Sequence, residues 1–291
     1  MRTCRLLSWL LAPLLAAALA GPAAADSPSR FEEQRSLFQA AEEALVQKDR
    51  EAFRQALARL LDYPLHSALL SADLESRLSE ARPREVRAFL KEHGDTPHGA
   101  RLRHAWLSHL AREERWADLV RDFEPRRATT TLICHHRRAL LELGRNDEAL
   151  REVSRIWLTG ESLPDACTPL LDAWREAGGL TPTLAWDRLA LALEAGAPSR
   201  ARYIARYLPE DEQGWAQRWL DLYQHPAGVV QVGYTAESHP RAAEMLTQAW
   251  LRLARRDPQE ALALWQRAGE RQRLPGEQAR EVERTLALRL V

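Results

Sequence analysis

From Phe31 onward, short helical patterns alternate with turn-forming residues, and no sustained alternation of β-branched residues occurs. Leu102, Trp106 and Leu110 recur at the spacing that places side chains on one face of a helix. Alanine, leucine, arginine and glutamate dominate this region, and all four favour helices. The sequence therefore predicts an all-α fold.

The turns between these helical patterns follow a recurring scheme. Gly144 is predicted to end one helix, and Asn146 or Asp147 to cap the next, which would continue through Trp157. Similar turns precede helical patterns after residues 195–199 and 256–258. Helix hairpins that bury their faces only against neighbouring hairpins form α-solenoids. We expect a right-handed α-superhelix, curved and extended, with degenerate tetratricopeptide-like repeats, because the turn spacing is too variable for a regular tetratricopeptide array.

One short segment departs from the helical pattern. Residues 229–234 read Val-Val-Gln-Val-Gly-Tyr and lie between Pro226 and Pro240. The segment is too short and too isolated to indicate a sheet, so we interpret it as an extended linker or loop.

The N-terminus has the features of a secretory signal peptide. Arg2 and Arg5 precede an apolar run over residues 6–20, and small residues at 23–25 offer a cleavage site. We predict a signal peptide over residues 1–25, which would carry Cys4 with it, and export into an oxidising compartment. An uncleaved anchor helix is the alternative. No second apolar run indicates a membrane span after cleavage.

Charge excludes several classes of partner. The whole chain carries 41 basic and 41 acidic side chains, and loss of residues 1–25 would leave it slightly acidic. Proteins that bind nucleic acid usually carry a basic footprint, and a polybasic membrane surface needs clustered lysine and arginine. We therefore expect neither a nucleic-acid partner nor a polybasic membrane-binding surface.

Cys134 and Cys167 remain after signal cleavage. An even pair of cysteines in an oxidising compartment predicts a disulfide, which would stabilise the fold by about 3–4 kcal/mol in the chain-entropy model. Two buried free thiols are an alternative. A zinc site at Cys134-His135-His136 is disfavoured, because adjacent helical residues point about 100° apart. We assign no metal and no cofactor.

Tryptophan is abundant, with 10 residues in the chain. Those beyond the predicted signal peptide are Trp106, Trp116, Trp157, Trp174, Trp186, Trp215, Trp219, Trp250 and Trp265. Such a set could stack on carbohydrate, but most of these positions fall on the apolar face of a predicted helix, which favours core packing. Trp215 and Trp219 are the pair for which the two interpretations are hardest to separate.

The segment Trp157–Cys167, together with Cys134, resembles one family, the soluble lytic murein transglycosylases. The likeness extends to Asp62-Tyr63-Pro64-Leu65, Gly94-Asp95-Thr96-Pro97 and Gly179-Leu180-Thr181, and becomes diffuse after about Tyr207. The resemblance implies the N-terminal superhelical, ring-forming scaffold of these enzymes. It also implies that the two cysteines form a disulfide. Family enzymes cleave the bond between N-acetylmuramic acid and N-acetylglucosamine in peptidoglycan, with one glutamate as acid and base.

The family's catalytic glutamate stands in a Glu-Ser dipeptide followed by Gly-Leu-Met-Gln. The Glu-Ser pairs of this chain, at Glu75, Glu161 and Glu237, lack that continuation. Motifs of serine hydrolases, zinc proteases and P-loop enzymes are also missing from the sequence. We assign no catalytic residue and expect residues 26–291 to be a scaffold domain, truncated before any lysozyme-like catalytic domain.

The resulting expectation is a periplasmic scaffold of peptidoglycan metabolism with glycan strands as its partner and no cleavage activity of its own. Several arginines could line a concave face and meet peptide-stem carboxylates, although ordinary surface solvation explains arginines on helices equally well. They are Arg101, Arg103, Arg137, Arg138, Arg151 and Arg155. The alternatives are a standalone periplasmic adaptor that binds other cell-wall proteins and an enzyme with an active site in the concave face.

Overall fold

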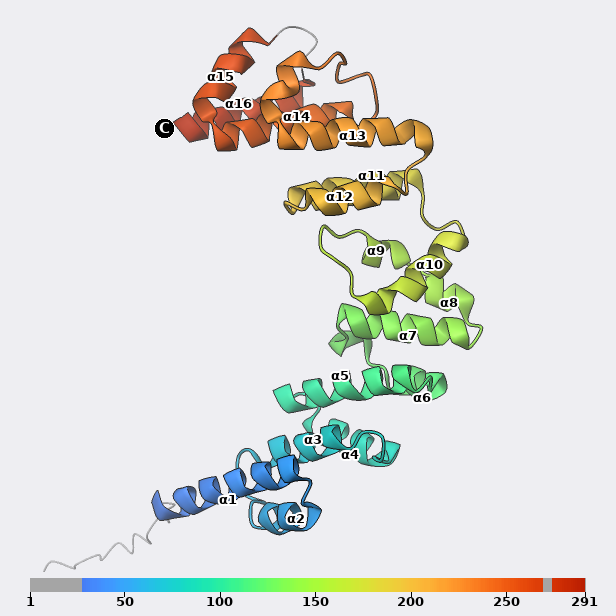
Figure 1. Ribbon diagram of the computed structural model, residues 1–291, viewed down its shortest axis with the longest axis vertical. Helices are drawn as coiled ribbons and strands as arrows, with labels where there is room; N and C mark the ends of the chain where they lie inside the picture. The colour runs from blue at the N-terminus through green and yellow to red at the C-terminus, as the bar shows by residue number, and fades with distance from the viewer. Residues whose placement is uncertain (1–27, 269–273, 291) are drawn as a thin grey trace, which may run out of the picture. The chain divides into compact units, whose positions relative to one another are not determined.

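The computed structural model describes residues 28–268 and 274–290, which contain helices and turns and no strand. The chain divides into two compact units, one up to Trp106 and the other from Leu107. The predicted all-α solenoid class is confirmed (Figure 1). The predicted signal peptide, residues 1–25, lies outside the described residues.

The first unit is built from consecutive helices whose last member, α5, runs on into the second unit. Their bounds are α1 (Pro28–Gln47), α2 (Arg50–Ala58), α3 (His66–Ser76), α4 (Pro83–His93) and α5 (Pro97–Arg112). A small core joins Phe53 of α2 and Leu69 of α3 to the alanines Ala41 and Ala44 of α1. Alanines at these contacts let the helix axes approach closely.

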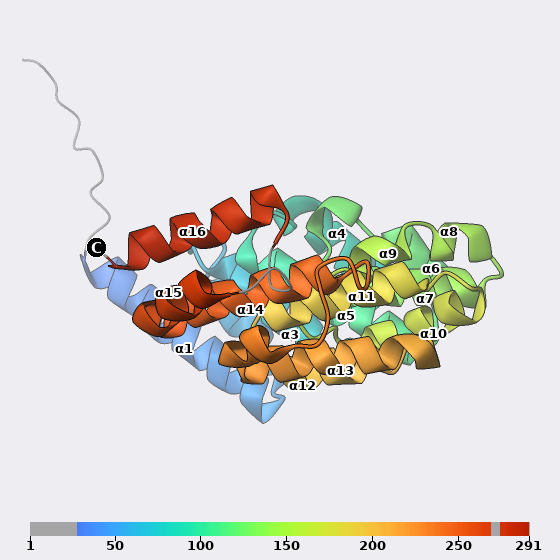
Figure 2. The same cartoon turned by 90° about the horizontal axis from the view of Figure 1, so that it is seen from above.

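The second unit continues the hairpin scheme. Its α-helices are α6 (Trp116–Asp122), α7 (Thr130–Glu142), α8 (Asn146–Leu150), α9 (Val153–Trp157), α10 (Thr168–Glu176), α11 (Pro182–Glu194), α12 (Pro198–Ala205), α13 (Glu210–Gln224), α14 (Ala242–Arg256), α15 (Pro258–Arg267) and α16 (Gly276–Leu290). Three 3-10 helices join them: η1 (Pro125–Arg127), η2 (Asp165–Cys167) and η3 (Pro226–Gln231). Helices α11 to α14 lie along a similar direction in both views (Figure 1, Figure 2).

Most tryptophans pack in the core. Trp106, Trp157, Trp174, Trp186, Trp219 and Trp250 are buried, whereas Trp116, Trp215 and Trp265 are half-buried. Trp219 is only 1% exposed, so its ring has no face left for a sugar. Trp215 stacks on His239 with the ring centroids 4.7 Å apart. Packing within the protein therefore accounts for both members of the ambiguous pair.

The turn after α7 confirms Gly144 as the residue that ends the helix. Gly144 has a φ of 74°, in the left-handed region. Its N–H donates to the Leu141 carbonyl over 2.9 Å, and the Arg145 N–H donates to the Leu140 carbonyl over 2.8 Å. These two bonds satisfy carbonyls that the end of a helix leaves unpaired. The same pair of bonds follows α5, where Glu114 occupies the left-handed position with a φ of 54°.

Substitutions at Gly144 and Glu114 should change the free energy of unfolding in opposite directions. We expect Gly144→Ala to lower the free energy of unfolding by about 1 kcal/mol, because an L side chain is strained in the left-handed region. A Cβ at Gly144 would meet no atom within 4 Å, so the effect is confined to the backbone. Glu114→Gly should raise stability by about 0.5 kcal/mol for the converse reason. Urea unfolding of both variants measures this; a loss of stability in Glu114→Gly would contradict it.

Two predictions about the region after Gly144 were wrong. The residue that precedes α8 is Arg145, and no side chain caps the helix, so neither Asn146 nor Asp147 is the N-cap. Arg145 takes the N-cap position directly after the turn, and its guanidinium offers no acceptor for the N–H groups of the helix. The predicted single helix through Trp157 is also broken, because Glu152 adopts a φ of 57° between α8 and α9.

Residues 229–234 were predicted to be an extended linker or loop, and the first three of them belong instead to the 3-10 helix η3. Residues three apart share one face of a 3-10 helix. Pro226 and Val229 have this spacing, and both are buried. Burial of this short apolar face against α13 and α14 explains why the segment coils. The order of apolar and polar residues in this segment does not indicate which helices it packs against.

Candidate functional site

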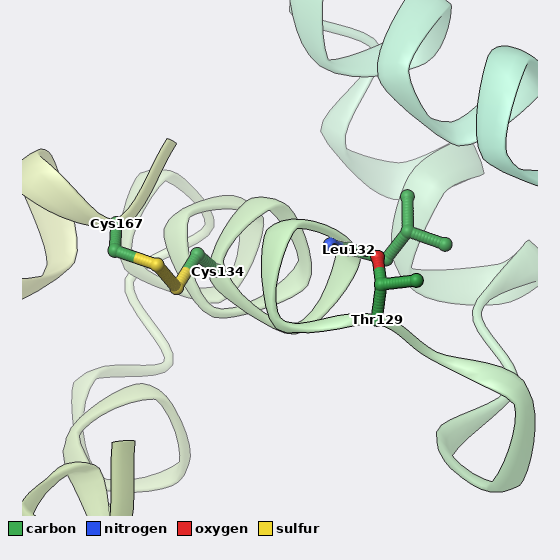
Figure 3. Close-up of a disulfide and its surroundings, with 4 residues drawn as sticks. All are labelled: Thr129, Leu132, Cys134 and Cys167. Atoms are coloured by element: carbon green, nitrogen blue, oxygen red, sulfur yellow. Dashed lines mark hydrogen bonds between the residues drawn. A yellow bond between two sulfur atoms is a disulfide. The ribbon is translucent and has the colours of Figure 1, made fainter. Parts of the chain in front are cut away.

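A disulfide between α7 and η2 is the strongest local constraint in the second unit. Cys134 and Cys167 are joined, and both are fully buried. The side chain of Thr129 caps the start of α7 by accepting a hydrogen bond from the Leu132 N–H over 3.4 Å (Figure 3). The disulfide therefore attaches the end of the loop that leads into α10 to α7, a helix whose first turn is itself capped.

The zinc alternative at Cys134-His135-His136 finds no support in the described residues, among which no group of three or more metal ligands gathers. His136 instead stacks on Phe123, with ring centroids 3.9 Å apart. Burial lowers the pKa of His136 to about 4. The imidazole is therefore neutral at neutral pH and packs as an aromatic ring.

This lowered pKa predicts a pH dependence of stability. The unfolded chain takes up the proton near pH 6.5, before the folded protein does. The stabilisation by His136 is thus fully present above about pH 6.5 and is lost as the pH falls toward 4. We expect a loss of about 1–2 kcal/mol, a value reduced for the partial exposure of the ring. Urea unfolding between pH 7.5 and 4.5 should show a shallower decline for His136→Phe; parallel curves for wild type and variant would contradict the prediction.

The loop over residues 158–167, here called the clamp loop, is held at three points. Its last residue, Cys167, is bonded to α7. The Arg200 guanidinium, from α12, donates to the Gly160 carbonyl and, over 2.9 Å, to the Ser162 hydroxyl. A Cβ at Gly160 would lie 2.5 Å from the Leu191 carbonyl oxygen, so only glycine fits against α11 there. The loop is consequently fixed in one position.

Behind the clamp loop lies a cavity of about 250 Å³, here called the clamp cavity. It is lined by Trp157, Ser162, Leu163, Pro164, Thr168, Leu171, Asp172, Trp174, Arg175, Leu180, Arg188, Arg200, Tyr203 and Tyr207. Aromatic rings form much of its wall: the Trp157 ring packs edge-on against Tyr207, with centroids 5.5 Å apart. Tyr203, which is 53% exposed, is hydrogen-bonded to Tyr207 through the two hydroxyls over 2.9 Å.

Three arginines and one carboxylate line the clamp cavity. Arg175 pairs with Asp172 over 3.0 Å, and Arg200 binds the clamp loop. Arg188, from α11, is only 7% exposed, and its guanidinium lies over the Trp157 ring at 4.1 Å from the centroid. Burial lowers the pKa of Arg188 from its ordinary value. A cavity with a net positive lining and aromatic walls suits an anion attached to an apolar body.

The arginines singled out in the sequence are mostly occupied within the protein. Arg101 pairs with Glu75 over 2.9 Å, and Arg138 lies 3.5 Å from Glu142. The others with partners bind backbone carbonyls or a neighbouring acid, namely Arg103, Arg137 and Arg155. Arg151 is exposed. Of these six, none lines the clamp cavity.

Sequence reasoning missed Arg175, Arg188 and Arg200. Arg188 directly follows Asp187 in α11, so the sequence shows two adjacent opposite charges and gives no sign that the arginine is buried. Arg175 and Arg200 also carry no signal, because their neighbours in the sequence are polar as often as apolar.

The three Glu-Ser pairs lie in a helix, a loop and a turn, where local contacts or solvent surround them. Glu75 pairs with Arg101 and accepts a hydrogen bond from Ser71 over 2.9 Å. Glu161 is exposed on the clamp loop. Ser238 bonds to Thr235 within a turn. None of the three glutamates lines the clamp cavity, whereas Ser162, which follows Glu161, does.

The sequence of this chain is similar to that of known proteins. No known protein-family profile matches the chain. The soluble lytic murein transglycosylases of Escherichia coli K12 and Salmonella typhimurium are each 27% identical over 261 residues, which cover 90% of this chain and 40% of the relative. The chain thus spans about two fifths of the length of these relatives.

Solved structures agree with the sequence comparison. The 70 kDa soluble lytic transglycosylase SLT70 from Escherichia coli superposes with a TM-score of 0.76 at 27% identity, over 89% of this chain and 42% of that one. Lytic transglycosylase Slt from Pseudomonas aeruginosa gives a TM-score of 0.74 at 32% identity, over 87% and 41%. The predicted resemblance to the soluble lytic murein transglycosylases is confirmed.

Proposed function

We propose that this chain is a helical scaffold of peptidoglycan metabolism, exported to the periplasm, that binds glycan strands of peptidoglycan and does not cleave them with its own residues. The observation that carries the proposal is similarity to soluble lytic murein transglycosylases over 90% of the chain, with a shared helical fold. Peptidoglycan metabolism is the process in which these relatives act, as their name states.

The scaffold role is supported by the surroundings of the candidate catalytic groups. General acid catalysis on a glycosidic bond uses a carboxyl whose pKa is raised by burial, commonly with a second carboxylate nearby. Glu161 is exposed and Glu75 is paired with Arg101. These glutamates lie in ordinary polar surroundings, so we propose that the chain contributes shape and binding. No helix within residues 28–268 and 274–290 has the length and apolar character to cross a bilayer.

Two assays with the purified chain test this proposal. Sedimentation with purified sacculi should pull the chain into the pellet, with insoluble cellulose as the matched control. A peptidoglycan zymogram, together with analysis of released muropeptides, should show no cleavage. Clearing of the gel would overturn the scaffold role in favour of an enzyme. Absence from the sacculus pellet, with capture of periplasmic proteins instead, would favour the adaptor alternative.

A further inference from the structure

Arg188 is a buried cation that has neither an ion-pair partner nor a hydrogen-bond partner in the part of the chain that the structure describes. It is 7% exposed, and its Nε has no hydrogen-bond partner. The titratable groups that act on its charge are Arg200 and the hydroxyls of Tyr203 and Tyr207, with no carboxylate among them. Burying an unpaired charge costs several kcal/mol, so a position of this kind is unfavourable in the absence of an anion.

Arg188 is part of the wall of the clamp cavity. The Nε atom is sealed from solvent, and Arg188 is one of the residues that line the cavity, so we infer that its terminal nitrogens are the donors available there. Its ring partner Trp157 is itself held, because the indole N–H donates to the Leu184 carbonyl over 3.0 Å. The cation is therefore presented in a fixed orientation, and a ligand would not have to order it.

We propose that the clamp cavity binds an organic carboxylate through the Arg188 guanidinium. The inference goes beyond the proposed function and stands without it, because it rests on Arg188 and its surroundings alone. The planar fork of a guanidinium matches the two oxygens of a carboxylate. Arg175 is paired with Asp172, and Arg200 uses its donors on neutral groups of the clamp loop, so Arg188 is the lining arginine whose donors are left for a carboxylate.

The walls of the cavity define the rest of the ligand. Leu163, Pro164 and Leu171 offer apolar surface, and Tyr203 stands half-exposed among the lining residues. A volume of about 250 Å³ is smaller than the usual pocket for a drug-sized molecule. The cavity can thus hold a carboxylate together with a body the size of a dipeptide or one amino sugar, and the remainder of a larger ligand would lie outside it. Such a carboxylate could come from a peptidoglycan fragment or from a free peptide.

Binding is tested by NMR titration, with the Trp157 indole N–H signal as the reporter. The probes are muramyl dipeptide, the same molecule with its carboxylate converted to an amide, and the acetylated dipeptide without the sugar. We expect muramyl dipeptide to bind and the amide to bind at least tenfold more weakly, because a charge-assisted hydrogen bond contributes about 10- to 100-fold in affinity. Equal binding of the acid and the amide would overturn the proposal.

The sugar-free dipeptide distinguishes the sources. Affinity equal to that of muramyl dipeptide points to a peptide carboxylate alone, and weaker affinity points to a peptidoglycan fragment; both support a carboxylate site. Failure of the proposed scaffold function has a separate readout, because the sacculus assay can fail while these small molecules still bind.

Variants of Arg188 give a second, independent measurement. Arg188→Met should weaken muramyl dipeptide about 10- to 100-fold and, without ligand, raise Tm by about 2–4 °C, because it removes an unpaired buried charge. Arg188→Lys keeps the charge, loses the fork and should bind with intermediate affinity. Arg202→Met, at an exposed arginine of α12, is the matched control and should leave both measurements unchanged. Undiminished binding by Arg188→Met together with a lower Tm would show that Arg188 is structural and would overturn the proposal.

Discussion

Removing the Cys134–Cys167 bond with the variant Cys134→Ala/Cys167→Ala is expected to lower the free energy of unfolding by about 3–4 kcal/mol. The bond closes a loop with a sequence separation of 33, and without it the unfolded chain regains the conformational freedom of that loop. Both cysteines are fully buried, so the variant also leaves small cavities next to α7. Urea unfolding monitored by circular dichroism gives the difference directly.

The single variants provide the control for this prediction. Either Cys134→Ala or Cys167→Ala removes the whole bond, so each should lose nearly as much as the double variant, and the two losses should not add. Wild-type protein unfolded under reducing conditions should match the variants. Equal urea midpoints for oxidised and reduced wild type would contradict the proposed contribution of the bond.

The clamp loop should respond to the same change. Once Cys167 is released from α7, Arg200 and the contact of Gly160 with α11 are the remaining attachments. We therefore infer that loss of the disulfide loosens one wall of the clamp cavity. The bond then links stability to binding, because the cavity is preformed only while the loop is held.

Replacing Trp219 by alanine is the second change for which we expect a large effect, a loss of about 3–5 kcal/mol in the free energy of unfolding. The ring is 1% exposed, and its centroid lies 5.9 Å from that of Trp186 on α11. Its indole N–H donates to the Gln248 side chain of α14 over 3.3 Å. Truncation would therefore open a cavity where α11, α13 and α14 meet.

Two further variants separate cavity formation from other causes. Trp219→Phe retains most of the ring volume and should lose less, about 1–2 kcal/mol. Trp215→Ala lies four residues earlier on α13 and truncates a half-buried ring, so it should also lose less than Trp219→Ala. Thermal and urea unfolding of the three proteins would rank them. Wild-type stability in Trp219→Ala would refute the assignment of this ring to the core.

Local features were readable from the sequence because local physics controls them. The turn at Gly144 needs a residue that tolerates a positive φ, and a glycine in the sequence indicates such a position. Glu152 occupies the same backbone region without any such signal, so the break between α8 and α9 was invisible. The coil of η3 was missed for a related reason: burial of Val229 against neighbouring helices decides it, whereas its sequence favours extension.

By itself, the sequence determined the all-α class, the hairpin turns, the disulfide between Cys134 and Cys167 and the resemblance to the soluble lytic murein transglycosylases. These depend on residue order over a few turns of helix or on extended similarity. The tertiary structure alone decided the clamp cavity, whose arginines come from α10, α11 and α12. Helices separated in the sequence must pack before their charges can share one space, and no local pattern records which cation will be left without a partner.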